Sequence, residues 1–124
     1  MNSMTITLLV TFWAMQIIAQ LFFKHGSASP GRWLTCFILG NVFGASSIWL
    51  LMKLYQRMDP NTALALGSAG GFLGAQLFLA LVFHSRPTVL QWTGFVAVAI
   101  GMTLATVGVA KPVSEPVATA QVQQ

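Results

Sequence analysis

Two glutamines, Gln16 and Gln20, are the residues whose type and spacing suit binding chemistry best in this sequence. They stand four residues apart in an otherwise apolar stretch, so on a helix their amides share one face. A primary amide donates and accepts hydrogen bonds without taking up a proton. We therefore expect a substrate pathway lined by Gln16 and Gln20, with Phe12 and Trp13 beside them. Interhelical hydrogen bonding, typically worth about 0.6 kcal/mol per pair, is the alternative.

Two further amides, Asn41 and Gln76, lie alone in apolar stretches. We expect Asn41 to contribute to the same pathway, although an isolated amide also serves simply to bridge two helices. No Asp, Glu, Lys or Arg lies well inside an apolar stretch, where a charge costs about 2.5–3.5 kcal/mol or more.

The sequence holds no arrangement of residues typical of catalysis or metal binding. His25 and His84 lie at the ends of apolar stretches, and Cys36 is the single cysteine, so no set of metal ligands recurs at a fixed spacing. Paired carboxylates, nucleophile–histidine pairs and phosphate-binding glycine loops are absent from the sequence. We expect neither an enzyme nor a metal or cofactor site.

The composition excludes an ordinary soluble domain. Of 124 residues, 56% are hydrophobic and 6% charged, whereas soluble domains carry about a quarter charged residues. The net charge of +4 comes from six bases and two acids that do not cluster, which argues against a nucleic-acid partner. We expect an integral protein whose surroundings are a lipid bilayer, in a bacterial-type inner (plasma) membrane.

Four stretches are long enough to cross the hydrocarbon core, which takes about 20 apolar residues of helix. They cover residues 6–23, 33–55, 62–83 and 89–110. The short connectors each contain a proline, and short links make neighbouring helices antiparallel. The predicted fold is an all-α membrane protein, with four transmembrane helices in up-down-up-down hairpin order forming a domain over residues 1–110. Residues 111–124 lose the apolar run and are predicted to form a flexible tail.

The basic residues are divided equally between the two sides that alternating spans define. One side receives Lys53, Arg57 and Lys111, and the other receives Lys24, Arg32 and Arg86. An excess of Lys and Arg in cytoplasmic loops normally sets orientation. Two interpretations stay open: the chain inserts both ways up and assembles as an antiparallel pair, or a partner or loop length fixes its orientation.

Small residues recur along faces of the predicted spans, and such faces mark close helix contacts in lipid. The fourth span carries Gly94, Ala97, Gly101, Ala105 and Gly108, and the third carries Gly67, Gly70, Gly71 and Gly74. We expect these faces to pack helices and to form a homodimer, or a heterodimer with a paralogous subunit. Packing inside a single four-helix bundle is the alternative. The glycines of the third span also weaken that helix and would let it bend.

Several segments of the chain resemble a known family. Residues 60–71, PNTALALGSAGG, resemble the start of the third helix of the drug/metabolite transporter superfamily. Residues 86–94 and 99–102 are similar to its closing loop and last helix. Residues 19–24, AQLFFK, resemble the first-helix end of small aminoarabinose-lipid flippase subunits. Over about residues 6–110 the chain resembles a small multidrug resistance-like or EamA-like member.

The resemblance implies a dimeric transporter that works by alternating access. Small multidrug exporters carry a glutamate eight residues before the first-helix lysine, and that position is Gln16 here. Because an amide cannot carry the proton, the resemblance points away from proton-coupled drug export and towards a flippase-like or uncoupled member.

We therefore expect a transporter or flippase of a small organic solute or a lipid-linked sugar. A non-transporting membrane subunit of a larger complex is the second hypothesis. The absence of a carboxylate from the spans agrees with this hypothesis as well as with the first. Proton-coupled export of cationic drugs is the third hypothesis. It ranks last, because no side chain in the spans is suited to carry the proton.

Overall fold

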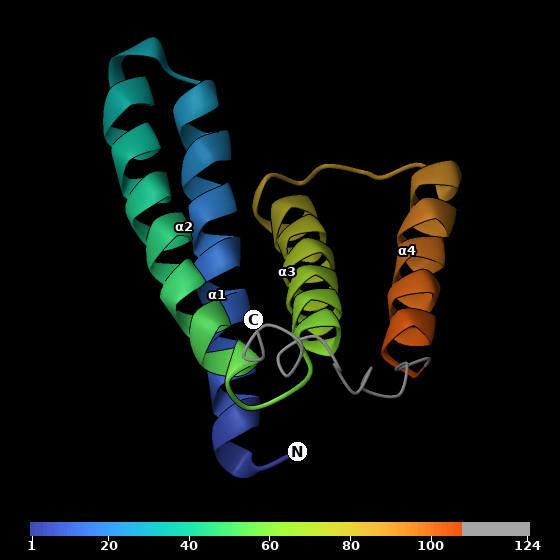
Figure 1. Cartoon of the computed structure of the whole chain (residues 1–124). Coiled ribbons are helices and arrows are strands. Elements are labelled where there is room, and N and C mark those ends of the chain that lie inside the picture. Colours follow the sequence, from blue (N-terminus) through green and yellow to red (C-terminus); the bar gives the residue numbers. More distant parts are fainter. Residues whose placement is uncertain (108–124) are drawn as a thin grey trace, which may run out of the picture.

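The structure is a computed structural model that describes residues 1–107 and is all-helical over that range. Its helices are α1 (Ser3–Ser27), α2 (Trp33–Tyr55), α3 (Pro60–Val82) and α4 (Val89–Val107) (Figure 1). Each of the four is long and apolar enough to span a membrane. The prediction of an all-α fold with four helices of membrane-spanning length and composition is confirmed over these residues. The expected tail, 111–124, and the end of the fourth expected span, 108–110, lie outside the described residues.

The ends of the helices follow local capping chemistry more closely than hydropathy. The helix α1 continues through Lys24 and His25 in its last turn, beyond the apolar stretch, where positive charge suits the helix dipole. Before α3, the Asp59 carboxylate accepts a hydrogen bond from Thr62 N at 3.0 Å, and Pro60 occupies the first turn. A single 3-10 turn, η1 (Pro30–Arg32), leads directly into α2.

The helix α1 lies at the centre of the arrangement, because α2 and α3 both pack against it (Figure 1). The contact of α2 with α3 is smaller, and α4 packs on α3 alone within the described residues. One short link joins α1 to α2 and another joins α3 to α4 at the upper end of the view in Figure 1.

The packing of α2 on α1 depends on small residues in α2. The Phe23 ring occupies the space where a side chain at Gly40 would stand, and Gly44 lies 4.0 Å from the Ala19 methyl group, measured from an ideal Cβ position. At the edge of this contact, the rings of Phe22 and Phe43 stack with centroids 5.9 Å apart. Small residues thus let the two helices approach closely without any charged pair.

The packing of α3 on α1 depends on glycine in the same way. Successive glycines of α3 lie against successive side chains of α1: Gly67 against Phe12, Gly70 against Trp13, Gly71 against Gln16, and Gly74 against Ile17. At Gly70 the missing side chain lets the Trp13 indole reach the backbone, where Nε1 donates to the carbonyl oxygen of Leu66 at 3.0 Å.

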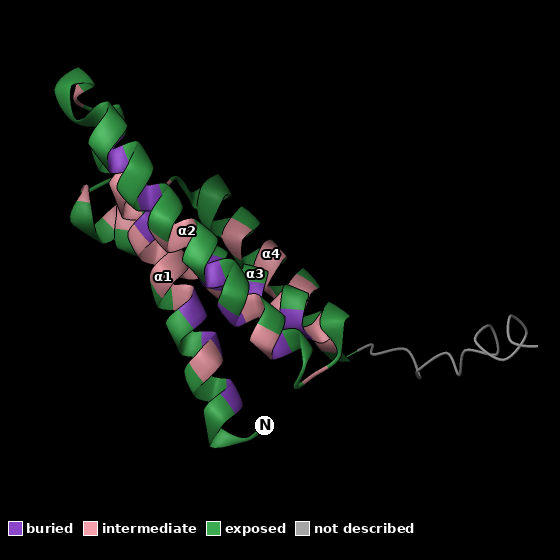
Figure 2. Cartoon of the chain, turned by 60° about the vertical axis from the view of Figure 1, so that its left-hand side comes forward, coloured by how far each residue is buried: buried purple, intermediate pink, exposed green. Residues whose placement is uncertain are grey.

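The core is small and lies where the first half of α1 meets the end of α2 and the start of α3. Leu9, Leu54 and Ala63 form it, each at most 3% exposed. Most other apolar side chains face outward, so buried positions form only narrow strips along the helices (Figure 2). An outward apolar surface of this extent is expected of helices that contact lipid.

The helix α4 has no buried residue. Its less exposed side chains, such as Phe95 and Met102, lie on a different face from its small residues. The small residues Gly94, Ala97, Gly101 and Ala105 are all exposed, and no atom lies within 4 Å of an ideal Cβ at Gly94 or Gly101. The α4 small-residue face, as we call these four residues, therefore has no partner in the described part of one chain; Gly108 lies outside that part.

Candidate functional site

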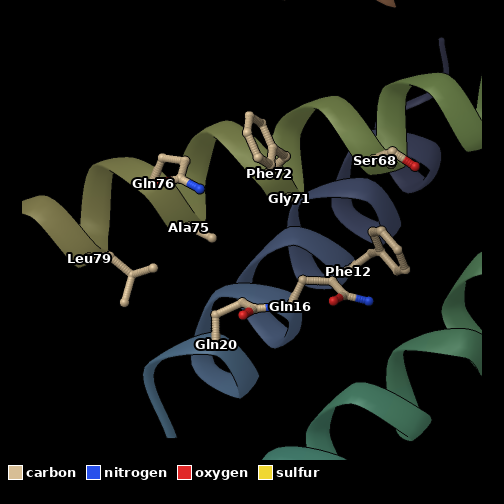
Figure 3. Close-up of a pocket in the computed structure, with 10 residues that line it drawn as sticks. Phe12, Gln16, Gln20, Ser68, Gly71, Phe72, Ala75, Gln76 and Leu79 are labelled. Atoms are coloured by element: carbon tan, nitrogen blue, oxygen red, sulfur yellow. The ribbon is translucent and has the colours of Figure 1, made fainter. Parts of the chain in front are cut away.

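A cavity of about 430 Å³, with both polar and apolar residues in its lining, lies between α1 and α3 (Figure 3). We refer to it as the central cavity. Its lining residues are Phe12, Gln16, Gln20, Gly67, Ser68, Gly71, Phe72, Ala75, Gln76 and Leu79. Three amides and one hydroxyl thus line this space, and the rest of its lining is aromatic, aliphatic and glycine residues. The volume falls within the range of about 300–1,000 Å³ that is typical of small-molecule sites.

The wall from α1 is formed by one face of that helix. Phe12, Gln16 and Gln20 recur every four residues, so they point to the same side, as Figure 3 shows. Gln16 lies next to the midpoint of α1, which places its amide near the middle of the helix length. The structure brings both predicted glutamines and Phe12 to a single cavity.

The Gln16 side chain is held in place by α2. Its Nε2 donates to Ser47 Oγ at 2.8 Å, and Ser47 Oγ donates in turn to the carbonyl oxygen of Gly44 at 2.6 Å. Ser47 is fully buried, at 0% exposure. Because one amide proton is directed to α2, the remaining amide proton and the oxygen of Gln16 are left for other partners. The interhelical bond and the cavity position therefore coexist at this residue.

The wall from α3 contains residues that the sequence analysis did not single out as a group. Ser68, Phe72 and Gln76 follow one another at intervals of four residues, and all three line the central cavity (Figure 3). In the sequence, Gln76 stands out only as an isolated amide. The four-residue spacing of a hydroxyl, a ring and an amide is the signal in the sequence that would have identified this wall.

Two of the expected pathway residues lie elsewhere. Trp13 packs against Gly70 and donates to the Leu66 carbonyl, so it holds α1 and α3 together and does not line the central cavity. Asn41 is exposed on α2, and its Nδ2 donates to the carbonyl oxygen of Phe37 at 2.7 Å, one turn back in its own helix. The structure does not bring these two side chains to Gln16 and Gln20.

Among residues 1–107, no ionisable side chain lines the central cavity. Asp59, at the start of α3, is the single carboxylate side chain among residues 1–107. Within the same residues no group of three or more His, Cys, Asp or Glu side chains is placed to hold a metal ion. The chemistry available to a bound molecule is thus hydrogen bonding to amides and a hydroxyl, with contact to the rings of Phe12 and Phe72.

The fold and the site together define a class: a small helical protein with four helices long and apolar enough to span a membrane. Within residues 1–107, amides, a hydroxyl and apolar groups line a cavity between two of these helices. Comparison with known proteins adds no narrower assignment. The chain matches no family model, no curated protein and no solved structure.

Proposed function

We propose that this protein is a transporter or flippase that moves a small organic solute or a lipid-linked sugar through the central cavity. In this proposal the four helices cross the membrane in up-down-up-down order, and two copies form the working unit by alternating access. The single observation that carries the proposal is a cavity of about 430 Å³, lined by three amides and a hydroxyl, beside the midpoint of a helix that is long and apolar enough to span a membrane.

The position of the polar groups supports this interpretation. Amides facing hydrocarbon lack hydrogen-bonding partners, at a cost of about 2–7 kcal/mol per group depending on the reference state. Gln16 uses part of its capacity on Ser47, but Gln20 and Ser68 are exposed in the single chain. A hydroxyl-rich or otherwise polar molecule in the cavity, or water, provides the partners that acyl chains cannot.

A second copy of the chain would supply the missing wall of the cavity. Gln20, Ser68 and Phe72 line the cavity yet are exposed, so one chain does not enclose it. The α4 small-residue face is likewise uncovered. Small-residue faces let helices associate closely in lipid, which favours this face as the contact between two copies. The resemblance to the drug/metabolite transporter superfamily supports the same dimeric arrangement.

The lining described for the central cavity carries no charge, and this favours some transport mechanisms over others. Proton-coupled export of a cation needs a group in the pathway that binds the proton and the cation in turn, and the described cavity lining offers only amides, a hydroxyl and apolar groups. We therefore favour a flippase-like or uncoupled mechanism over proton-coupled drug export.

A non-transporting subunit of a larger complex is the second candidate. The uncovered faces of α4, which has no buried residue, suit a foreign helix as well as a second copy. Copurification in mild detergent separates the two: a stoichiometric unrelated protein supports the subunit, whereas self-association supports the transporter.

The transport proposal is tested in proteoliposomes with two probes, a radiolabelled hexose and a fluorescent isoprenyl-phosphate hexose. The double variant Gln16→Ala with Gln20→Ala is expected to lower transport of the probe that the protein accepts by about tenfold or more, since each lost bond to a neutral group costs about 1 kcal/mol. Thr11→Val is the matched control, because the Thr11 hydroxyl is exposed on α1 and donates to Thr7 of the same helix. Unchanged transport in the double variant would remove these amides from the pathway.

A further inference from the structure

A second, smaller hollow lies where α3 ends and α4 begins. We call it the α3–α4 pocket; its volume is about 230 Å³. It is lined by Gln76, Ser85, Arg86, Pro87, Gln91 and Phe95. Its lining is mostly polar, and Arg86 is the one charged side chain that lines either this pocket or the central cavity within residues 1–107.

The α3–α4 pocket adjoins the central cavity. Gln76 lines both spaces. The ring of Phe72, in the central cavity, meets the ring of Phe95, in the α3–α4 pocket, edge to face with centroids 5.9 Å apart. One amide and one aromatic pair therefore stand between the two spaces.

The polar side chains of the α3–α4 pocket mainly offer hydrogen-bond donors. Arg86 presents only donors, in a planar fork that matches the geometry of phosphate and carboxylate oxygens. Gln91 Oε1 accepts from Thr88 N at 2.8 Å in the cap of α4, which leaves the NH₂ group of Gln91 free to donate to another partner. The Ser85 hydroxyl adds a further donor.

The charges around the pocket favour an anion. Arg86 follows the end of α3, whereas Asp59, the one carboxylate side chain in residues 1–107, precedes its start. The two are therefore separated by a helix of 23 residues, about 34 Å long. The link between α1 and α2 lies at the same end of the molecule as the link between α3 and α4 in Figure 1, and it carries a second arginine, Arg32. The cationic group in the pocket thus lacks an acidic neighbour in the described part of the chain.

We propose that the α3–α4 pocket binds an anionic oxygen group, a phosphate or a carboxylate, of the transported molecule. Arg86 takes the anion in a forked contact, with Gln91, Ser85 and Gln76 donating beside it. The neutral part of the molecule then lies towards the Phe72–Phe95 pair and the amides of the central cavity. The inference rests on the proposed function and narrows it, since it selects anionic over cationic cargo.

Binding is measured with the full chain, labelled with ¹⁵N, in nanodiscs. One arm titrates inorganic phosphate into phosphatidylcholine nanodiscs, and the other replaces part of the phosphatidylcholine with phosphatidylglycerol. The readout is the set of resonances from Ser85, Arg86 and Gln91. Arg86→Gln is the test variant. Arg32→Gln is the matched control, because it removes the same charge at the same end without touching the pocket.

We expect saturable shifts with the wild-type chain, about tenfold or more weaker affinity in Arg86→Gln, and no comparable loss in Arg32→Gln. Shifts with phosphate support a soluble anionic group, and shifts with phosphatidylglycerol alone support an anionic group carried by a lipid. The inference is overturned if neither arm gives saturable shifts, or if the two variants lose affinity equally. Because the assay requires no transport, a protein that transports yet binds no anion refutes this inference alone. Binding without transport refutes the proposed function and leaves an anion site.

Discussion

The Nε2 atom of Gln16 donates to the Oγ atom of Ser47 at 2.8 Å, and this bond joins α1 to α2 beside the central cavity. The bond explains how a side chain of the candidate pathway is held in one orientation. A flexible glutamine side chain whose amide had no hydrogen bond would lose conformational entropy on binding cargo. The bond to buried Ser47 fixes the Gln16 amide beforehand and so reduces that loss.

Removal of this bond is the first prediction. Ser47→Ala is expected to lower the free energy of unfolding in detergent by about 1 kcal/mol, because the Gln16 amide loses its acceptor in a buried place. Unfolding is followed by circular dichroism during titration with a denaturing detergent. Ser46→Ala is the control, since Ser46 is exposed and bonds only to Val42 of its own helix. Equal effects of the two variants would contradict a special role for the Gln16–Ser47 bond.

The second prediction concerns the contact of α1 with α3. Gly70→Ala places a methyl group into the Trp13 indole, so it is expected to destabilise the protein by about 1–3 kcal/mol through overpacking. The same unfolding titration measures the loss. Gly31→Ala serves as the control, because no atom lies within 4 Å of an ideal Cβ there. A Gly70→Ala protein as stable as the wild type would mean that α1 and α3 pack differently in the membrane.

The third prediction tests the α4 small-residue face. Gly101→Leu is expected to weaken self-association by about tenfold or more, because the added side chain keeps two such faces from approaching. The monomer–dimer ratio in nanodiscs or by cysteine crosslinking reports the effect. Val96→Phe adds comparable bulk to another exposed position of α4 and is expected to leave the ratio unchanged. A dimer that tolerates Gly101→Leu would assign the contact to another surface.

The start of α3 gives the fourth prediction. Asp59→Ala removes the acceptor of the Thr62 N–H, so the free energy of unfolding is expected to fall by about 1 kcal/mol. Asp59→Asn retains a side-chain oxygen at the cap and is expected to restore most of the loss. Thermal unfolding of both variants in detergent checks the comparison. If Asn and Ala behave alike, the cap contributes through charge and not through its hydrogen bond.

Most of the fold was predictable because each helix carries its own signal. A stretch of apolar residues long enough to cross a bilayer has to bond its own backbone in lipid, so residues 33–55 were predicted as a span and form α2 with the same bounds. The largest difference is in α1, which runs over Ser3–Ser27 where 6–23 was expected. Hydropathy marks where side chains turn polar, whereas the backbone of α1 continues its hydrogen bonds for another turn through Lys24 and His25.

The candidate site was predictable only in part. The shared face of Gln16 and Gln20 follows from helix periodicity within one element, and both residues line the central cavity. The contribution of Ser68, Phe72 and Gln76 depends on which face of α3 turns towards α1, and the glycines at 67, 70, 71 and 74 set that orientation. Asn41 lies away from the cavity because Gly40 and Ser47 form the face of α2 that packs on α1.

The amino-acid sequence alone determined that this chain forms four long apolar helices suited to a membrane, since composition and backbone bonding in lipid leave few other solutions. It also determined that no carboxylate lies within those helices. Only the tertiary structure decided which polar residues share a cavity. Contacts between helices depend on the rotation of each about its axis, and close packing at Gly40 and Gly70 selects that rotation. The pairing of Gln16 with Ser47, and the arrangement of Gln16 and Gly71 along one cavity, are consequences of that packing.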